Sequence, residues 1–511
     1  MSEPIADKNA AEISPPWPEV LAAPSLWALA ALAAASVGMR LGLALVNVNE
    51  AEYTDGILQL TLFSRGNPYW PPLYSALAVL TGKAVGDLEL GGRLVSAVLG
   101  GLAVVPISAM AGKIGGRRAG VMAGVAFMAA PEALRWGVRV MTDASFLTLF
   151  AASLCLLMPR QEGAPSSGRI IWGTVVAVLA TLTRYQGLIL VFPILWGLVR
   201  AWREKRCLAA PLAAQILWLA IPLWIVRGGF AHLQQVLQRT GADEGLSPVE
   251  TLLSYWNLAE CYFLFFPYSL TPPIFLCFLA GLFLPRVCQR RTGRWFLAVF
   301  LLAGALILAT QAVFGIFEFR YLLPLLAFVL PFAGMGLDRL DRALANRRNL
   351  AMAVFCVVLG WPVLFSAASL LFQRQAFGDI KAASQFAAQA VGPDVRVVSN
   401  ECYNDKIPVV KTSFWVGREV QRAQLDTVQE GDCLILSSLY SGGVDLMDYW
   451  ERMLQSGFHI QELARFDGMV LPLLPDIMSI RGAHGSPLAW FYRYQWQNFF
   501  TVVVRIGEAK P

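Results

Sequence analysis

Long apolar runs separated by short polar loops dominate the hydrophobic pattern of this chain of 511 residues. A membrane-spanning helix needs about 20 consecutive, mainly apolar residues. The runs that approach this length fall at 25–47, 92–112, 119–134, 144–158, 170–183, 187–200, 208–226, 270–285, 295–314, 321–337 and 350–372. The pattern therefore predicts a polytopic α-helical membrane protein with about 11 transmembrane helices.

Composition supports this prediction, and the positions of the basic residues explain the positive net charge. The chain is 56% hydrophobic and 15% charged, whereas a soluble protein carries about 25% charged residues. The net charge is +6, and its basic residues gather in four loops: Lys113, Arg117 and Arg118; Arg200, Arg203, Lys205 and Arg206; Arg286, Arg290, Arg291 and Arg294; and Arg339, Arg342, Arg347 and Arg348. With the N-terminus in the cytoplasm, all four loops are cytoplasmic, as the positive-inside rule requires. The positive charge thus indicates membrane orientation rather than nucleic-acid binding.

This orientation requires that residues 71–87 do not cross the membrane. Their apolar run is short and contains Lys83, which suits a helix lying along the outer surface. Residues 51–65 suit a second such helix. The loop at 227–269 and everything after residue 373 then also lie on the outer face.

Three parts of the chain follow from these patterns. Residues 1–24 are polar and lack a basic leader, so we expect a cytoplasmic N-terminal segment rather than a cleaved signal peptide. Residues 25–372 form the transmembrane part, with its outer-face loop and surface helices at 48–91. Residues 373–511 combine short β-like runs with helical patterns and predict an extracytoplasmic α/β domain. The β-like runs are at 395–400, 433–438 and 501–506, and the helical patterns are near 379–391 and 444–456.

An acidic stretch, NVNEAEYTDG at 47–56, follows the first span and holds Glu50, Glu52 and Asp55. Glu52 and Asp55 would share one face if this segment were helical. Asp55 before Gly56 equally suits a turn, and carboxylates in a solvated loop need no function. Three together, followed by a surface helix, favour a site.

Basic and acidic side chains in the other outer segments complement this stretch. Arg139 precedes Asp143, Arg184 lies between two closely spaced spans, and Arg320 precedes the span that begins at Tyr321. Arginines at the membrane boundary often serve as simple anchors. Their planar guanidinium groups also suit bidentate binding of a phosphate. The combination indicates a reaction centre for a phosphate-bearing lipid.

Several segments together resemble a known family. In order they are PPLYSALAVLTGKAVGDLELGGRLVSAVLGGLAVV, GRRAGVMAGVAFMAAPEALRWGVRVMTDASFL, LTRYQGLIL and FRYLLPLLAF. They resemble the dolichyl-phosphate-mannose protein mannosyltransferase superfamily, in particular the bacterial branch with the lipid A aminoarabinose transferases. The resemblance implies a C-type (GT-C) glycosyltransferase fold. It also implies transfer of a sugar from a polyprenyl-phosphate donor to a lipid, glycan or protein hydroxyl on the outer face of the cytoplasmic membrane.

The resemblance also implies roles for individual residues. The first-loop carboxylate of the family falls on Asn49 or Glu50, and the second acidic position falls on Asp143. Because Asn49 is not acidic, the general base would be Glu50, with Glu52 and Asp55 as alternatives. We expect Asp143 to orient the acceptor or to hold Arg139.

A Trp replaces the basic residue that often precedes the family's Pro-Pro pair, here Pro71 and Pro72. Other cations would then bind the donor phosphate: Arg184, Arg320, Arg139 and Lys83. The residues expected to line the substrate cavity are Tyr53, Tyr69, Trp70, Tyr185, Gln186 and Tyr321.

No histidine accompanies the carboxylates, since the three are at 232, 459 and 484. We therefore expect no zinc site and no obligatory metal, while Mg²⁺ or Mn²⁺ on oxygen ligands remains compatible with the residues. Two other functions fit a polytopic protein. A transporter would use a charge within a span, such as Arg40. A non-catalytic scaffold would present the outer domain to a partner.

Overall fold

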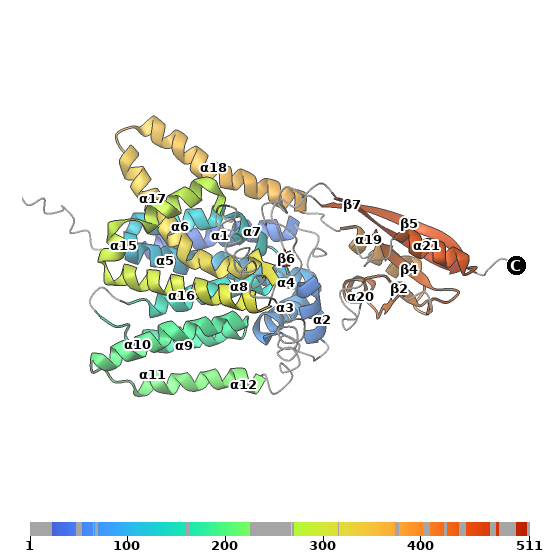
Figure 1. Ribbon diagram of the computed structural model, residues 1–511, viewed down its shortest axis with the longest axis horizontal. Helices are drawn as coiled ribbons and strands as arrows, with labels where there is room; N and C mark the ends of the chain where they lie inside the picture. Colours follow the sequence, from blue (N-terminus) through green and yellow to red (C-terminus); the bar gives the residue numbers. More distant parts are fainter. Residues whose placement is uncertain are drawn as a thin grey trace, which may run out of the picture.

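The computed structural model describes residues 23–46, 54–64, 66, 70–159, 163–224, 267, 270–314, 316–373, 378–401, 409–423, 427–438, 446–470, 477–479 and 497–507. A bundle of long helices makes up most of the chain, and a small α/β domain lies at one end of it (Figure 1). Helices α2, α3 and α4 lie at the end of the bundle that faces this domain. The predicted fold class, a polytopic helical membrane protein with a C-terminal α/β domain, is confirmed.

The bundle contains α1 (Leu26–Val46), α2 (Thr54–Ser64), α3 (Pro72–Val85), α4 (Leu88–Leu102), α5 (Val104–Gly115), α6 (Arg117–Ala129), α7 (Pro131–Trp136), α8 (Thr142–Leu157), α9 (Ser167–Thr181), η1 (Tyr185–Leu190), α10 (Val191–Arg203), α11 (Ala209–Ala213), η2 (Ala214–Leu219), α12 (Ala220–Trp224), α15 (Pro285–Gln289), α16 (Arg291–Phe314), β1 (Ile316–Glu318), η4 (Phe319–Leu325), α17 (Leu326–Leu344) and α18 (Arg348–Gln373). A further helix, Leu270–Leu282, precedes α15. The C-terminal domain contains α19 (Gly378–Ala390), β2 (Val397–Ser399), α20 (Lys411–Val416), β3 (Gln421–Arg422), β4 (Cys433–Ser437), α21 (Leu446–Gln455), β5 (His459–Val470), β6 (Ile477–Ser479) and β7 (Gln497–Gly507).

Every predicted span falls on a described helix or on consecutive helices. Six helical stretches of the described residues are long and apolar enough to cross a membrane. One boundary was wrong: the run at 119–134 is not one helix, because α6 ends at Ala129 and α7 begins at Pro131. Ala130 is extended, as the residue before a proline favours, and Pro131 has no N–H to continue the helix.

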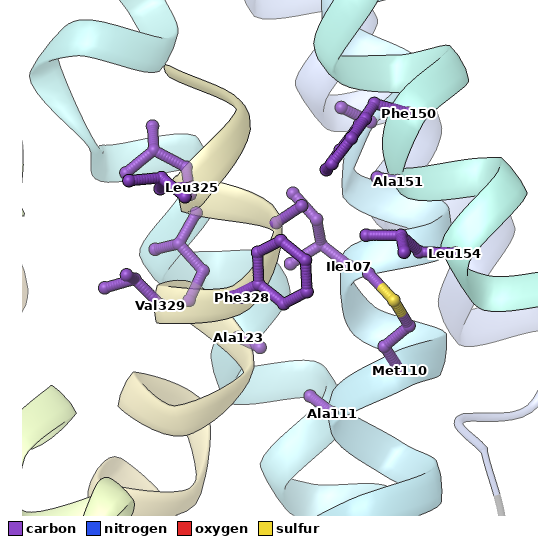
Figure 2. Packing of buried hydrophobic residues seen from close by; sticks show 14 of the residues in the cluster. Ile107, Met110, Ala111, Ala123, Phe150, Ala151, Leu154, Leu325, Phe328 and Val329 are labelled. Atoms are coloured by element: carbon purple, nitrogen blue, oxygen red, sulfur yellow. The ribbon is translucent and has the colours of Figure 1, made fainter. Parts of the chain in front are cut away.

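The core of the bundle forms around α17, which is the most buried of the long apolar helices, whereas α1 and α18 are the least buried. Figure 2 shows Phe328 of α17 facing Ile107 and Met110 of α5 and Leu154 of α8. Small residues bring the backbones together, since a Cβ at Gly334 would overlap α6 at Ala123. Close approach through small residues is typical of helices packed in a membrane.

The C-terminal domain has a five-stranded mixed sheet in the order β3-β2-β4-β7-β5. Strand β2 is parallel to β3 and β4, and β7 is antiparallel to β4 and β5. Alternate residues face opposite sides, as a strand requires. Ile435 of β4 packs in the cluster with α19, and Leu434 packs in the cluster with α21. The central strand β4 is therefore buried on both faces.

The sequence places two cysteines, Cys402 and Cys433, in the predicted outer domain, where an oxidising compartment would allow a disulfide between them. Cys433 lies buried in β4, and burial raises the pKa of its thiol to about 11. Cys402 lies outside the described residues. A disulfide between them stays a prediction.

Asp379, in the first turn of α19, gives the domain a pH dependence. It is buried and accepts a hydrogen bond from Thr501 Oγ1 at 2.6 Å. Burial raises the pKa of its carboxyl group, while the bond from Thr501 opposes that rise. A carboxyl group whose folded pKa lies above its unfolded pKa stabilises the fold below the unfolded pKa. That contribution is lost as the pH rises through the folded pKa.

We expect Asp379→Asn to reduce this pH dependence, because an amide does not ionise and its oxygen still accepts from Thr501. Between about pH 5 and about pH 8, the fall in Tm should be smaller in the variant by roughly 2–4 °C. Thermal unfolding of both proteins at the two pH values measures this. Equal falls would show that Asp379 does not titrate differently in the folded and unfolded states.

Candidate active site

A buried ion pair between Asp143 and Arg184 lies at the centre of the candidate site. Asp143 is in the first turn of α8, where a carboxylate is favoured by the helix dipole, and is only 3% exposed. Arg184 is the extended residue that precedes η1, and its Nη1 donates to Asp143 Oδ1. Asp143 Oδ2 is buried and has no hydrogen-bond partner among the described residues. One carboxylate oxygen thus remains available to a bound molecule.

Arg320 joins this pair through Tyr321. The guanidinium carbon of Arg184 lies 5.0 Å from the centre of the Tyr321 ring, and that of Arg320 lies 5.2 Å from it. Arg320 is 6% exposed, and its Nη1 lies 3.8 Å from Met141 Sδ, two residues before Asp143. The half-buried Arg184 and the buried Arg320 therefore share one aromatic ring, where cation–π attraction adds to their placement.

Arg139 lies near this group but takes a different partner from the one expected. Its guanidinium carbon is 5.7 Å from the centre of a Trp136 ring. The ion-pair partner of Asp143 is Arg184, not Arg139.

Arg40, a marker for the transporter alternative, is fully buried against α7. It donates to Ser36 Oγ at 2.6 Å and to the Ala133 carbonyl oxygen at 3.4 Å. Its guanidinium carbon lies 4.6 Å from the centre of the Phe127 ring. These contacts belong to the packing of α1 on α6 and α7, which is how a membrane protein accommodates a buried charge.

The acidic first loop reaches the site through α2. A Cβ atom at Gly56 would overlap the carbonyl oxygen of Val140, so the first turn of α2 lies directly on the segment that leads into Asp143. Asp55 is in that turn, which is helical and not a β-turn. The side chain of Asp55 lies outside the described residues. The same is true of Glu50, Glu52, Tyr53 and Tyr69, whose predicted roles the structure leaves open.

Gly56→Ala tests this contact. We expect it to lower turnover by about 10- to 100-fold, because the added methyl group must push α2 away from Val140, and small displacements of reacting groups are costly. The rate of polyprenyl phosphate release measures the loss. Gly42→Ala in α1 is the matched control, because a Cβ at Gly42 would meet nothing within 4 Å and its φ is not positive. An unchanged rate in Gly56→Ala would show that the position of α2 is unimportant.

The remaining predicted residues divide into two groups. Tyr185 and Gln186 follow Arg184 on η1 and are half-buried, and Gln186 Oε1 has no partner in the described part of the chain. Trp70 packs instead against hydrophobic residues of the C-terminal domain. Lys83 is exposed in the last turn of α3 and makes no hydrogen bond or ion pair with a described residue of the cluster. Asp143, Arg184, Arg320 and Tyr321 are thus brought together, and Lys83 is not.

Sequence reasoning missed a contact between the bundle and the C-terminal domain. Glu89, in the first turn of α4, is 4% exposed and forms an ion pair with Lys381 of α19 at 2.9 Å. Trp415 of α20 donates its Nε1 hydrogen to the same carboxylate at 3.1 Å. The position of Glu89 just after the N-cap residue Asp87 indicated only a helix start.

Metal ligands do not gather in the described part of the molecule: no three His, Cys, Asp or Glu side chains there could hold a metal ion together. The side chains of the first-loop carboxylates lie outside the described part of the chain. The expectation that no metal is obligatory therefore stays a prediction.

These features define a multi-pass helical membrane protein with a C-terminal α/β domain. Residues 70–226 match the family model described as dolichyl-phosphate-mannose-protein mannosyltransferase. The matched region includes Asp143 and Arg184. The resemblance indicated by the sequence is confirmed.

Solved structures agree on the fold. The crystal structure of ArnT from Cupriavidus metallidurans bound to undecaprenyl phosphate matches with a TM-score of 0.56 and 15% identity, covering 95% of this chain and 100% of that one. The apo structure of the same protein gives a TM-score of 0.50 and 16% identity, covering 93% and 98% of the two chains. A comparison with curated proteins gives no significant match.

Proposed function

We propose that this protein is an integral membrane glycosyltransferase. It moves a sugar from a polyprenyl-phosphate-linked donor to a hydroxyl group of a lipid, glycan or protein acceptor. The observation that carries the proposal is the cluster of Asp143, Arg184, Arg320 and Tyr321, which lies beside the first turn of α2. The family match and the fold of ArnT, which was crystallised with undecaprenyl phosphate, support the donor class.

The charge of the cluster suits this chemistry. Arg184 and Arg320 carry two positive charges, and Asp143 carries one negative charge. A phosphate-linked donor gains negative charge on its phosphate as the bond to the sugar breaks. Guanidinium groups held in place with little access to water stabilise such charge strongly. Arg184 and Arg320 are the proposed phosphate ligands, because Tyr321 holds both.

The proposed reaction is a single displacement at the anomeric carbon. The acceptor oxygen forms the new bond to that carbon while the bond to the phosphate oxygen breaks. Polyprenyl phosphate leaves with the electron pair, and the proton of the acceptor hydroxyl passes to a carboxylate. Glu50 is the proposed general base, with Glu52 and Asp55 as alternatives. One displacement inverts the configuration of the sugar carbon. Asp143 Oδ2 would accept a hydrogen bond from the acceptor.

The proposed location is the cytoplasmic (inner) membrane, with the N-terminus in the cytoplasm and the C-terminal domain on the periplasmic side. Two of the basic loops follow α10 and α17, and these turns lie at the end of the bundle away from the C-terminal domain (Figure 1). Arg118 of the first loop pairs with Asp341 near the fourth at 3.7 Å, so these loops share one side. The positive-inside rule places that side in the cytoplasm.

Purified protein incubated with a panel of polyprenyl-phosphate sugars tests the proposal. We expect one donor to release free polyprenyl phosphate when membrane extract supplies the acceptor. Parallel reactions with EDTA and with added Mg²⁺ or Mn²⁺ test the expectation that no metal is obligatory. If no donor is turned over under any condition, the transferase is excluded, and transport or a scaffold function would have to explain the cluster.

A further inference from the structure

We propose that Glu89, Lys381 and Trp415 form a positioning contact through which the C-terminal domain holds α2, whose first turn contains Asp55, in place for the reaction. The role rests on the proposed function, and the contact itself is independent of it. Glu89 bonds to Lys381 and Trp415, whereas Asp143 pairs with Arg184, so these three residues would act through α2 and not on the substrate.

The contact is built around a buried carboxylate. Lys381 Nζ lies 2.9 Å from both oxygens of Glu89, and Trp415 Nε1 donates to Oε2 at 3.1 Å. Arg93, one turn along α4, lies 3.9 Å from Oε1. A carboxylate removed from water is stable only with such partners, so loss of Lys381 leaves a poorly compensated buried charge. The bundle therefore depends on α19 and α20 to complete this site.

Trp415 connects the carboxylate to α2. Besides donating to Glu89, its indole packs in an interdomain cluster with Ile57 and Leu58 of α2 and Ile380 of α19. These α2 residues follow Asp55 within one helical turn. On the opposite side, Gly56 lies against the Val140 carbonyl. The first turn of α2 is thus held between the segment leading into Asp143 and the C-terminal domain.

A second contact supports the same arrangement. Strand β6 of the C-terminal part pairs with β1, and Ile316, Phe317 and Glu318 lie opposite Ser479, Met478 and Ile477. Strand β1 ends two residues before Arg320. The C-terminal part of the chain therefore contacts the bundle at two places, through β6 at the strand before Arg320 and through α19 and α20 at α2.

Four variants test the contact, all in the full-length protein. Lys381→Met and Glu89→Gln should each lower kcat about tenfold with the donor KM changed less than about twofold, since misplacing a reacting group by an ångström costs up to about 100-fold. Lys381→Arg keeps a charged donor and should retain at least half of the wild-type kcat. The double variant should be no slower than either single one, because both break the same pair. Arg465→Met, which breaks an exposed pair with Asp467 in the same domain, is the matched control.

Hydrogen exchange of the α2 amides gives a readout that needs no substrate. We expect faster exchange over 54–64 in Lys381→Met, and unchanged exchange there in Arg465→Met. Wild-type rates and wild-type α2 exchange in Lys381→Met would overturn the proposal. It would also be overturned if activity fell only in proportion to the folded fraction in thermal unfolding. If the wild-type enzyme turns over no donor, the proposed function fails, and the exchange measurement still decides whether the contact holds α2.

Discussion

Asp143→Asn is expected to lower the rate of polyprenyl phosphate release on the order of 100- to 1000-fold. Asparagine keeps the shape and an oxygen that accepts from Arg184, so the change removes mainly charge. Arg184 then lacks its counter-ion in a buried place, and the acceptor loses the oxygen Oδ2, which no described residue occupies. The loss should appear in kcat at saturating donor.

Asp341→Asn is the control for this variant. Asp341 also pairs with an arginine, but both side chains are substantially exposed, at 36% for Asp341 and 69% for Arg118. Exposed pairs contribute little, so this variant should retain wild-type turnover. Since breaking a buried pair can destabilise a protein, thermal unfolding must show Asp143→Asn to be folded at the assay temperature. A folded Asp143→Asn protein with near wild-type turnover would remove Asp143 from the mechanism.

Glu50→Gln is expected to reduce turnover by roughly 100- to 10,000-fold, the range for loss of a general base. Glutamine has the same size but cannot take the proton of the acceptor hydroxyl. The substitution should leave binding of polyprenyl phosphate unchanged, because the proposed phosphate ligands are Arg184 and Arg320. Release kinetics together with a phosphate-lipid binding assay separate these two effects.

Glu52→Gln and Asp55→Asn are the matched controls, because they remove the neighbouring carboxylates one at a time. Each should retain most of the wild-type rate if Glu50 is the base. A normal rate in Glu50→Gln together with a large loss in Asp55→Asn would move the base to Asp55. If all three single variants turn over normally, none of these carboxylates is the base.

The sequence was sufficient to predict the helices of the bundle because the surrounding lipid restricts the structures that the backbone can form. Backbone groups in lipid must bond within their own segment, so an apolar run of sufficient length is forced to be helical. Three strands and two helices of the C-terminal domain were likewise predicted from their local patterns, and these are confirmed in β2, β4, β7, α19 and α21. The sequence patterns did not predict β3, β5, β6 or α20. The break at Pro131 could have been anticipated, because proline acts on its own backbone neighbours.

The candidate site was only partly visible, because its parts meet across long stretches of chain. The sequence indicated Asp143, Arg184 and Arg320 by type and by predicted depth. It did not indicate that Arg184 pairs with Asp143 across 41 residues. It also gave no sign that Gly56 approaches Val140.

By itself, the sequence determined the class of protein, the helices and the residue types of the reaction centre, since these depend on local hydrophobicity and on the chemistry of single side chains. Only the tertiary structure decided which arginine neutralises Asp143 and how α2 reaches it. It also decided that Glu89 meets Lys381 from 292 residues away. Such pairings follow from how helices and domains pack, and charge and hydrophobic pattern along a chain do not specify which distant partners packing brings together.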